Sequence, residues 1–181
     1  MLAPVPAVMV SCGNLETGPR NIITIAWAGT VCSEPPMVSI SIRPERFSYD
    51  IIRDTKEFAI NLATVPLIPS VDYCGICSGR THDKFAETGL TPARGSVIAA
   101  PLIAESPVNL ECRLRKILPL GSHDLFLAEI VAVDVAEGLI DRRGQLHLES
   151  AGLAAFSHGH YYALGKLLGK FGYSTRMKRF S

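Results

Sequence analysis

The sequence lacks the two features that would predict a large charged or lipid partner. Its 181 residues include 18 basic and 17 acidic side chains, and the net charge of +1 gives no general attraction for nucleic acid or an anionic membrane. No apolar run approaches the roughly 20 residues that a membrane-spanning helix needs. We therefore expect no nucleic-acid or membrane partner, and any anion-binding site must be local.

The common nucleotide and metal motifs are also missing. No G-x-G-x-x-G fingerprint follows a strand, and no Walker loop occurs, because Gly169-Lys170 is followed by Phe171. There is no H-E-x-x-H helix, and the pair His158 and His160 is more typical of a surface turn than of a metal site. These absences argue against a Rossmann dehydrogenase and a P-loop enzyme, and we predict no metal.

The five cysteines form no recognisable framework. Cys74 and Cys77 make a C-x-x-C, but Cys12, Cys32 and Cys112 stand alone on predicted strands, so a second pair of zinc ligands is lacking. A thioredoxin-like dithiol would need alternating strands and helices, and it remains the minor alternative to two small residues packing on a helical turn. The odd count and the lack of a secretory leader predict reduced thiols in a cytoplasm.

Strand-like alternation runs through most of the chain. About seven segments show it, at 5–12, 21–28, 38–43, 58–62, 109–118, 125–135 and 145–148. Helical signals are few and short, at 49–55 and in one or two turns between 70 and 90. No repeat, linker or charge block divides the chain, so we expect a single domain, 1–181, with the basic segment 161–181 as a C-terminal arm. The pattern predicts a closed or nearly closed antiparallel barrel.

A possible anion site follows the strand at 38–43. The turn Glu34-Pro35-Pro36 separates that strand from the one at 21–28, because proline cannot donate to a ladder. Arg46 then precedes Ser48, a predicted N-cap of the helix at 49–55, so a guanidinium, a hydroxyl and free helix amides would meet. That combination suits a phosphate, although a sheet edge with an ordinary capped helix fits these residues equally well.

A second loop adds the features that identify a family. Ser78 to Phe85, SGRTHDKF, places a hydroxyl and an ammonium at one loop-to-helix transition. Together with NIITIAWAG at 21–29, the Pro35-Pro36 turn and the turn Gly121-Ser122-His123-Asp124, it resembles the flavin reductase-like family, in particular its flavoredoxin branch. The resemblance runs from the first strand to the tail. It implies a mainly β fold, an antiparallel Greek-key split β-barrel with a few short helices, which binds FMN near the subunit interface of a homodimer.

The resemblance also implies a set of cofactor contacts. The strand from Thr24 to Trp27 would lie along the isoalloxazine ring and offer it backbone groups, and two cations and two hydroxyls would hold the phosphate. Asn61 would contact the ribityl chain or the ring, or else bond the turn that follows it. A whole FAD is not expected, since no second site for an adenylate is evident. The implied cofactor-binding residues are Thr24, Ile25, Ala26, Trp27, Cys32, Arg46, Ser48, Asn61, Ser78 and Lys84.

Two further residues have possible redox roles. His123 lies in the turn that resembles the family's loop near the flavin, where it would donate to a reduced flavin or position a nicotinamide, with Asp124 orienting it. The alternative is a structural histidine. Cys32 would tune the flavin or relay electrons to an acceptor such as ferric iron, although we prefer its interpretation as a buried small side chain.

The resemblance implies an oxidoreductase that passes electrons from NADH, NADPH or another carrier through bound FMN to a small-molecule or protein acceptor. Hydride transfer needs stacking at the correct distance, so the protein's task is chiefly positioning. Two other functions stay open, a reductase component that supplies free reduced flavin to a monooxygenase and a non-catalytic FMN-binding electron carrier. A barrel that binds no flavin is the remaining alternative.

Overall fold

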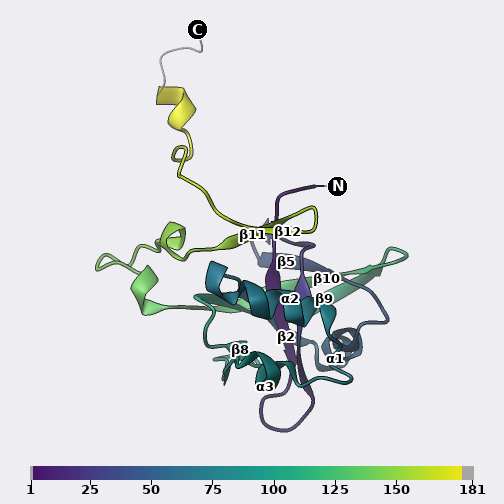
Figure 1. The fold of residues 1–181 in the computed structure, drawn as a ribbon. Coiled ribbons are helices and arrows are strands. Elements are labelled where there is room, and N and C mark those ends of the chain that lie inside the picture. The colour runs from purple at the N-terminus through teal and green to yellow at the C-terminus, as the bar shows by residue number, and fades with distance from the viewer. Residues whose placement is uncertain (1, 177–181) are drawn as a thin grey trace.

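A seven-stranded antiparallel sheet forms the centre of the molecule (Figure 1). The computed structural model of the protein describes residues 2–176. The strand order is β3-β2-β6-β9-β10-β5-β4, and each neighbouring pair is antiparallel. The strands are β2 (Val8–Gly13), β3 (Arg20–Ile25), β4 (Ala28–Ser33), β5 (Pro36–Ile42), β6 (Glu57–Leu62), β9 (Val108–Pro119) and β10 (Asp124–Val135).

The sheet must curl into a barrel because its two edge strands are consecutive in the chain. β3 and β4 occupy opposite ends of the strand order, yet only Ala26 and Trp27 separate them. The Ser41 amide donates to the Trp27 carbonyl at 3.0 Å and brings the two edges close, but β3 pairs with no strand on that side within the described sheet. The barrel is therefore split along β3. The strand predicted at 21–28 is in fact two strands, broken at this crossing.

The barrel interior follows the alternation in the sequence. Val38, Ile40 and Ile42 of β5 are buried, while Ser39 and Ser41 between them are partly exposed. All six residues of β2 are buried, because that strand lies between β3 and β6 and is covered on both faces. The main core cluster includes Val8, Val10, Ile25, Ile52, Phe58, Ile60, Cys112 and Phe126.

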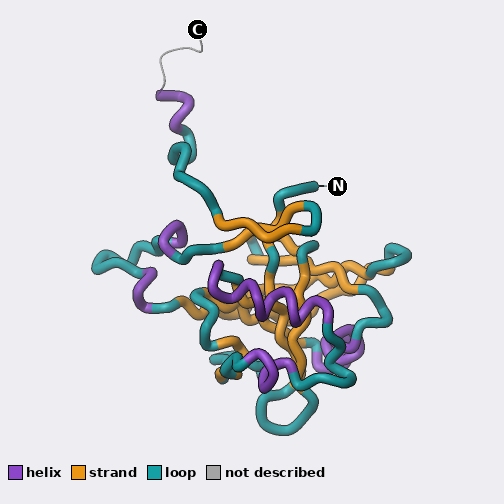
Figure 2. The backbone as a smooth tube through the Cα atoms, viewed as in Figure 1, coloured by secondary structure: helices purple, strands orange, loops and turns teal. Residues whose placement is uncertain are grey.

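Short helices and 3-10 turns occur in the connections, and the α-helices pack against the barrel, whereas the last 3-10 turn lies away from it (Figure 2). They are α1 (Phe47–Thr55), α2 (Ile68–Ile76), α3 (Lys84–Thr88) and the 3-10 turns η1 (Val65–Leu67), η2 (Glu137–Leu139), η3 (Leu148–Ser150) and η4 (Tyr173–Arg176). Val71 and Cys74 of α2 and Phe85 of α3 join Met9 and Ile22 in a second apolar cluster. The helical turns predicted between 70 and 90 are thus confirmed, and they pack over β3.

The end of the chain departs from the prediction. The segment at 145–148 makes only an isolated bridge, Ile140 to Leu146, and the last strands are β11 (Ala154–Ser157) and β12 (His160–Ala163). β11 pairs with β12 on one side and with β1 (Val5–Pro6) on the other, while β7 (Pro92–Ala93) and β8 (Leu102–Ile103) form a separate small sheet. The predicted first strand at 5–12 is split at Ala7. The predicted surface turn at His158 is confirmed, and positive φ angles at His158 and Gly159 reverse the chain there.

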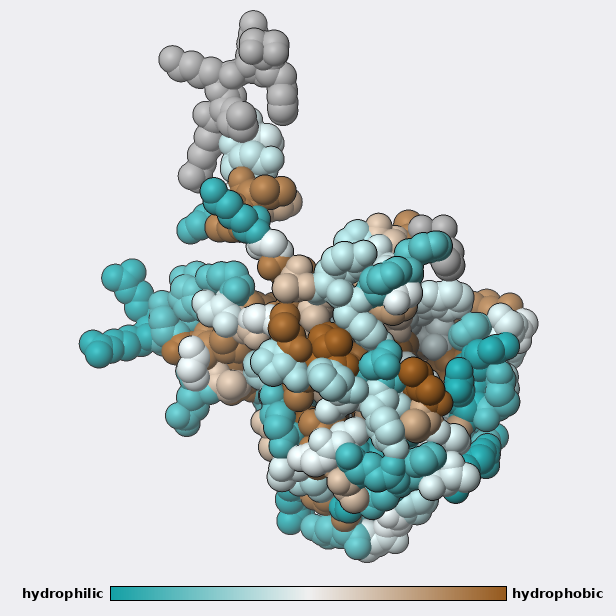
Figure 3. Space-filling model, viewed as in Figure 1, coloured by the Kyte–Doolittle hydropathy of each residue, from teal (hydrophilic) through white to brown (hydrophobic). Residues whose placement is uncertain are grey.

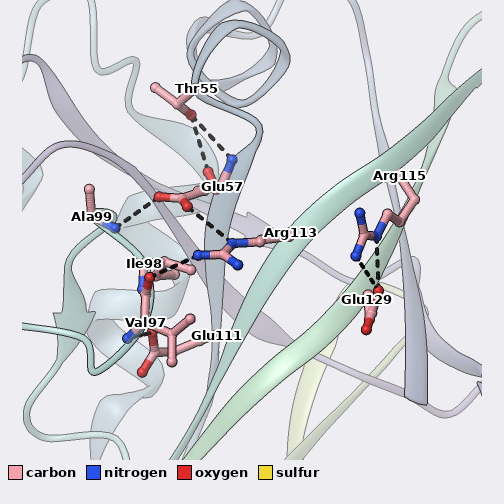
Figure 4. A network of polar contacts seen from close by, with 9 residues as sticks. All are labelled: Thr55, Glu57, Val97, Ile98, Ala99, Glu111, Arg113, Arg115 and Glu129. Carbon is pink, nitrogen blue, oxygen red and sulfur yellow. Dashed lines mark hydrogen bonds and ion pairs between the residues drawn. The ribbon is translucent and has the colours of Figure 1, made fainter. Parts of the chain in front are cut away.

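A buried carboxylate fixes the loop before β8 (Figure 4). Glu111 of β9 is fully buried and accepts from the amides of Ser96, Val97 and Ile98 at 2.7 to 2.8 Å. Glu57 accepts from the Ala99 amide at 2.9 Å. These bonds satisfy backbone donors that the loop itself cannot pair, so the loop is held against β6 and β9. Among the described residues, no helix has the length and apolar character to cross a bilayer.

Candidate functional site

A groove of about 200 Å³ lies along the split in the barrel. One wall is the end of β3 with the crossing segment, and the other is the end of β5 with the residues that follow it. Because β3 pairs only with β2, its outer edge has backbone groups that are free to bind a ligand. The lining residues are Ile23, Thr24, Ile25, Ala26, Trp27, Ser41, Ile42, Arg43, Arg46 and His123.

Trp27 and His123 form the aromatic end of this groove. Their ring centroids are 4.6 Å apart at an interplanar angle of 40°, and Trp27 is 54% exposed. The Ser122 hydroxyl lies 3.0 Å from His123 Nδ1. Asp124 instead accepts from the Tyr49 hydroxyl at 2.5 Å, a bond that raises the pKa of Tyr49. The prediction that Asp124 orients His123 is therefore wrong, because Asp124 is the first residue of β10 and lies under α1.

Thr24 contributes backbone rather than side chain to the groove. Its hydroxyl donates to the Val71 carbonyl of α2, and Gly75 of the same helix packs against its Cβ. The side chain thus anchors α2 to β3. The backbone N–H and C=O groups of Thr24 remain available to a ligand. This agrees with the backbone role predicted for the strand.

A second, narrower pocket of about 20 Å³ continues from the groove, with Ile23 and Arg46 lining both. The four residues predicted to hold a phosphate, Arg46, Ser48, Ser78 and Lys84, all line it. No acidic side chain lines the pocket within residues 2–176. Cations and hydroxyls without a counter-charge favour an anion. The other lining residues are Asn21, Phe47, Cys74, Gly75, Cys77 and Gly79.

Lys84 is the buried cation of this pocket, with 4% of its surface exposed. Its ammonium donates to the carbonyls of Ile22 and Cys74 at 2.7 and 2.8 Å, which leaves one of its three N–H groups for a ligand. In the described chain no carboxylate forms an ion pair with it. Desolvation lowers its pKa, since the charged form has lost its water.

Ser48 is held in a way that the sequence did not predict. It is the second residue of α1, whose N-cap is Arg46, so the predicted N-cap role is wrong. Its hydroxyl oxygen accepts from Asn21 Nδ2 at 2.8 Å, and both residues are buried. Asn21 is thus a site residue that sequence reasoning missed. The available signal was an amide side chain at the start of an otherwise apolar strand.

Gly79 lets the loop after α2 close over the pocket. A Cβ at this position would lie 2.2 Å from Asn21 Oδ1 and 2.7 Å from Phe47 Cδ1. Any larger residue would therefore push the loop away from α1 and β3. The next residue, Arg80, stacks its guanidinium 5.3 Å from the centre of the Phe47 ring, which fixes the loop from outside.

Two predicted contacts lie outside both cavities. Asn61 is fully buried and donates to the Met9 carbonyl at 2.8 Å, while its Oδ1 accepts from the Ile103 amide at 3.0 Å. It links β6 to β2 and β8, so it belongs to the framework. Cys32 lies on β4 with its thiol 3.3 Å from the Glu34 carbonyl, and it is partly exposed rather than buried.

The remaining chemistry-bearing side chains do not form a separate centre. All five cysteines are free, and burial raises the pKa of the Cys74 thiol to about 11. That shift keeps the thiol protonated and argues against a reactive dithiol with Cys77. No group of three or more histidine, cysteine or acidic residues suited to a metal occurs in the described part of the chain.

Comparison with known proteins finds matches over nearly all of the chain. Residues 2–165 match the family model of the flavin reductase like domain. An uncharacterized protein of Aeropyrum pernix is 34% identical over 151 residues, which are 83% of this chain and 56% of that protein. This chain thus spans little more than half of that relative's length.

Solved structures give the same fold. Flavoredoxin of Desulfovibrio vulgaris (Miyazaki F) is 30% identical, with a TM-score of 0.88 over 97% of this chain and 94% of its own. The FMN-binding protein from Thermus thermophilus is 25% identical, with a TM-score of 0.76 over 89% of this chain and 86% of its own. The predicted split barrel is therefore confirmed.

Proposed function

The chain belongs to the flavin reductase-like domain family, and on that basis we propose that it is an FMN-binding oxidoreductase. The observation that carries this proposal is the continuity of the two cavities. A groove with an aromatic end and free strand edge leads at Arg46 into a small pocket with two cations and two hydroxyls. A ligand that joins a flat ring to a phosphate would place its ring in the groove and its phosphate in the small pocket.

The proposed binding mode assigns each end of the ligand to one cavity. The ring lies along Thr24 to Trp27, and the phosphate reaches the pocket of Arg46, Ser48, Ser78 and Lys84. A phosphate monoester carries nearly two negative charges, so it would satisfy the third N–H of Lys84 and the guanidinium of Arg46. Asn61 and Cys32 are left out of the proposed site because neither lines these cavities.

FMN supplies the electron-transfer chemistry when it is bound, and the protein's residues bind and orient it. Trp27 and His123 limit the groove at one end and define the space for a nicotinamide or another donor. His123 presents Nε2 as its free ring nitrogen, because Nδ1 contacts Ser122. We propose NADH or NADPH as the donor, with His123 positioning it or donating to the reduced ring.

We further propose that the protein works as a homodimer in the cytoplasm. Leu2, Trp27 and Val31 are 92%, 54% and 50% exposed and line a cavity that adjoins the groove at Trp27. An apolar face of this kind on a protein surface usually marks an interface. A second copy placed there would cover the open side of the ring. The five free cysteines agree with a reducing compartment.

A flavin titration tests the binding proposal. Trp27 is the single tryptophan and lines the groove, so binding of either FMN or riboflavin should quench its fluorescence. FMN should bind at least about tenfold more tightly than riboflavin, since charge-assisted hydrogen bonds contribute about 1.5 to 3 kcal/mol each. Equal affinities for the two flavins would contradict the phosphate assignment, and the absence of any quenching would contradict flavin binding.

Matched variants locate the phosphate contacts. Arg46→Ala combined with Lys84→Met should remove the preference for FMN and leave riboflavin binding near the wild-type value. Arg53→Ala combined with Lys56→Met is the control, because it removes the same two positive charges from the exposed end of α1, where Arg53 pairs with Asp50. The control should bind both flavins as the wild type does.

Steady-state kinetics separate the oxidoreductase from its alternatives. Turnover with NADH or NADPH while FMN stays bound supports the proposal. Release of reduced FMN during turnover would instead identify a component that supplies flavin to a monooxygenase. Flavin binding without turnover on either nicotinamide would identify a carrier.

A further inference from the structure

The segment after β12 extends away from the body of the molecule (Figure 1). The arm predicted from residue 161 begins later, because residues 161–163 belong to β12. From here on, the arm means residues 164–173, which stand away from the body. Leu167 and Leu168 are 68% and 90% exposed, and Phe171 is fully exposed. Hydrophobic residues are visible along the arm in the space-filling view (Figure 3). Several large apolar side chains so close together on an extended segment indicate a docking partner.

The spacing of the arm residues shows how they would dock. Leu164, Leu167, Leu168 and Phe171 stand at positions i, i+3, i+4 and i+7, which would place them on one face of a helical turn. Lys166 and Lys170 would lie on the opposite face. Three glycines interrupt the segment, and each disfavours a helix by up to about 1 kcal/mol, so an isolated helix is not expected. The arm is thus suited to becoming ordered against an apolar surface.

The molecule offers such a surface next to the flavin groove. Two adjoining cavities of about 410 and 470 Å³ share Leu2, Val5 and Trp27 as lining residues. Val31 borders the first and Phe156 the second. We call these two cavities together the apolar trough. Trp27 also lines the proposed ring site, so whatever fills the trough borders the flavin.

The arm begins beside the trough. Phe156 of β11 pairs with Val5 on one side and with Tyr161 of β12 on the other, and the Phe156 and Tyr161 rings are 5.2 Å apart. The hairpin that lines the trough is therefore the hairpin from which the arm departs. In a twofold dimer built on this face, both arms start at the interface and extend over the partner.

We propose that the arm of one copy packs into the apolar trough of a second copy, and that this exchange closes the outer side of the flavin groove. The inference rests on the proposed homodimer. The second copy is the occupant that continuity favours, because the arm follows directly on the hairpin that lines the trough and points away from its own body. Leu167, Leu168 and Phe171 are the side chains that would enter.

Photo-crosslinking of the full-length protein tests the exchange. A benzophenone amino acid replaces Phe171, copies labelled with ¹⁴N and ¹⁵N are mixed and allowed to exchange subunits, and the crosslinked peptides are identified by mass spectrometry. We expect links from position 171 to peptides that contain residues 2–5 or 27–31. These links should include pairs that join a ¹⁴N peptide to a ¹⁵N peptide. Links only between peptides of the same isotope, links elsewhere, or no links would overturn the proposal.

Substitutions test what the exchange does. Leu167→Ser, Leu168→Ser and Phe171→Ser together should weaken dimerisation and FMN binding at least about tenfold, which is about 1.4 kcal/mol. The ratio of FMN to riboflavin affinity should stay at its wild-type value, because the phosphate pocket is unchanged. Lys166→Gln with Lys170→Gln is the control, and these exposed charges should change either affinity by less than about threefold.

Failure of this inference can be distinguished from failure of the proposed function. If wild-type protein dimerises and binds FMN but the serine variant does so equally well, only the arm exchange is overturned. Arm-dependent binding to anionic phospholipid vesicles without crosslinks to the trough would also overturn it, in favour of a membrane surface. A wild-type protein that binds no flavin would contradict the proposed function itself.

Discussion

Lys84 carries a positive charge on a side chain that is almost fully buried. An ammonium held by two backbone carbonyls has no negative partner among the described side chains, and its desolvation lowers its pKa below the usual 10.5. A phosphate in the neighbouring pocket would supply the missing charge. The unfavourable burial of Lys84 in the free protein would thus favour binding of the proposed anion.

The pKa of Lys84 gives a pH prediction. As pH rises through its lowered pKa, Lys84 loses its charge, so the affinity for FMN relative to riboflavin should fall at a pH below 10.5. Titrations of both flavins from pH 7 upward, followed by Trp27 fluorescence, would measure the ratio. Lys84→Met should remove the pH dependence, and a wild-type ratio that stays constant over this range would contradict the assignment.

Stability should change in the opposite direction with pH. A lysine whose pKa is lowered by folding binds more protons in the unfolded state, so its contribution raises the free energy of unfolding as pH increases toward 10.5. Comparison of wild type with Lys84→Met by urea unfolding at each pH isolates this contribution.

We expect Asn21 to position the Ser48 hydroxyl and not to contact the phosphate itself. Its amide donates to Ser48 Oγ at 2.8 Å, and in the proposed complex the Ser48 hydroxyl would donate its own proton to the phosphate. Asn21→Ala should weaken FMN binding roughly fivefold, about 1 kcal/mol, and leave riboflavin unaffected. Titration of the single and double variants with Ser48→Ala tests this, because two residues acting through one hydroxyl should give non-additive losses. Additive losses would indicate that Asn21 acts independently.

At the scale of elements, the loop at 94–101 depends on one strand side chain. Glu111 of β9 uses Oε1 for the Ser96 amide and hydroxyl and Oε2 for the amides of Val97 and Ile98. A carboxylate accepts hydrogen bonds on both oxygens. A glutamine at position 111 would instead point its NH₂ group at some of these backbone N–H donors, and two donors repel each other. The loop in turn covers β6. On that strand, Asn61 Oδ1 accepts a hydrogen bond from the Ile103 amide.

Glu111→Gln should therefore lower the free energy of unfolding by about 2 to 4 kcal/mol. Glu129→Gln is the matched control on β10, since Glu129 forms a partly exposed pair with Arg115, and it should lower that free energy by less than about 1 kcal/mol. Urea unfolding of both variants measures the difference. Equal losses in the two would mean that the loop does not need the carboxylate.

At the scale of the whole molecule, the sheet closure creates the site and also leaves it open on one side. The crossing at Ala26 and Trp27 turns the chain from one edge of the sheet to the other, and the exposed residues around that crossing form the proposed subunit interface. Flavin binding and dimerisation should therefore depend on each other.

Val31→Arg tests that dependence. A charge in the apolar trough should weaken the proposed dimer at least about tenfold, measured by sedimentation equilibrium, and should lower FMN affinity in parallel. Val97→Arg is the control, because Val97 is 42% exposed on the loop before β8 and lines neither the trough nor the groove. An unchanged FMN affinity in a monomeric Val31→Arg variant would separate the two functions.

The sequence alone predicted the elements whose signal is local. Alternation at 38–43, 58–62, 109–118 and 125–135 located four strands of the barrel, because burial of every second side chain leaves a period of two. The resemblance carried by the two polar loops placed Arg46, Ser48, Ser78 and Lys84 together, as the structure does. The strands β11 and β12 were missed, since four residues each give too short a pattern.

Only the tertiary structure decided how distant residues meet. The break between β3 and β4 follows from closure of the sheet, which no local alternation reports. The same closure brings Asn21 to Ser48 and directs Asp124 to Tyr49 rather than His123. Periodicity records which face of a strand is buried, but the contacts of a polar side chain depend on which other strand or helix that face meets.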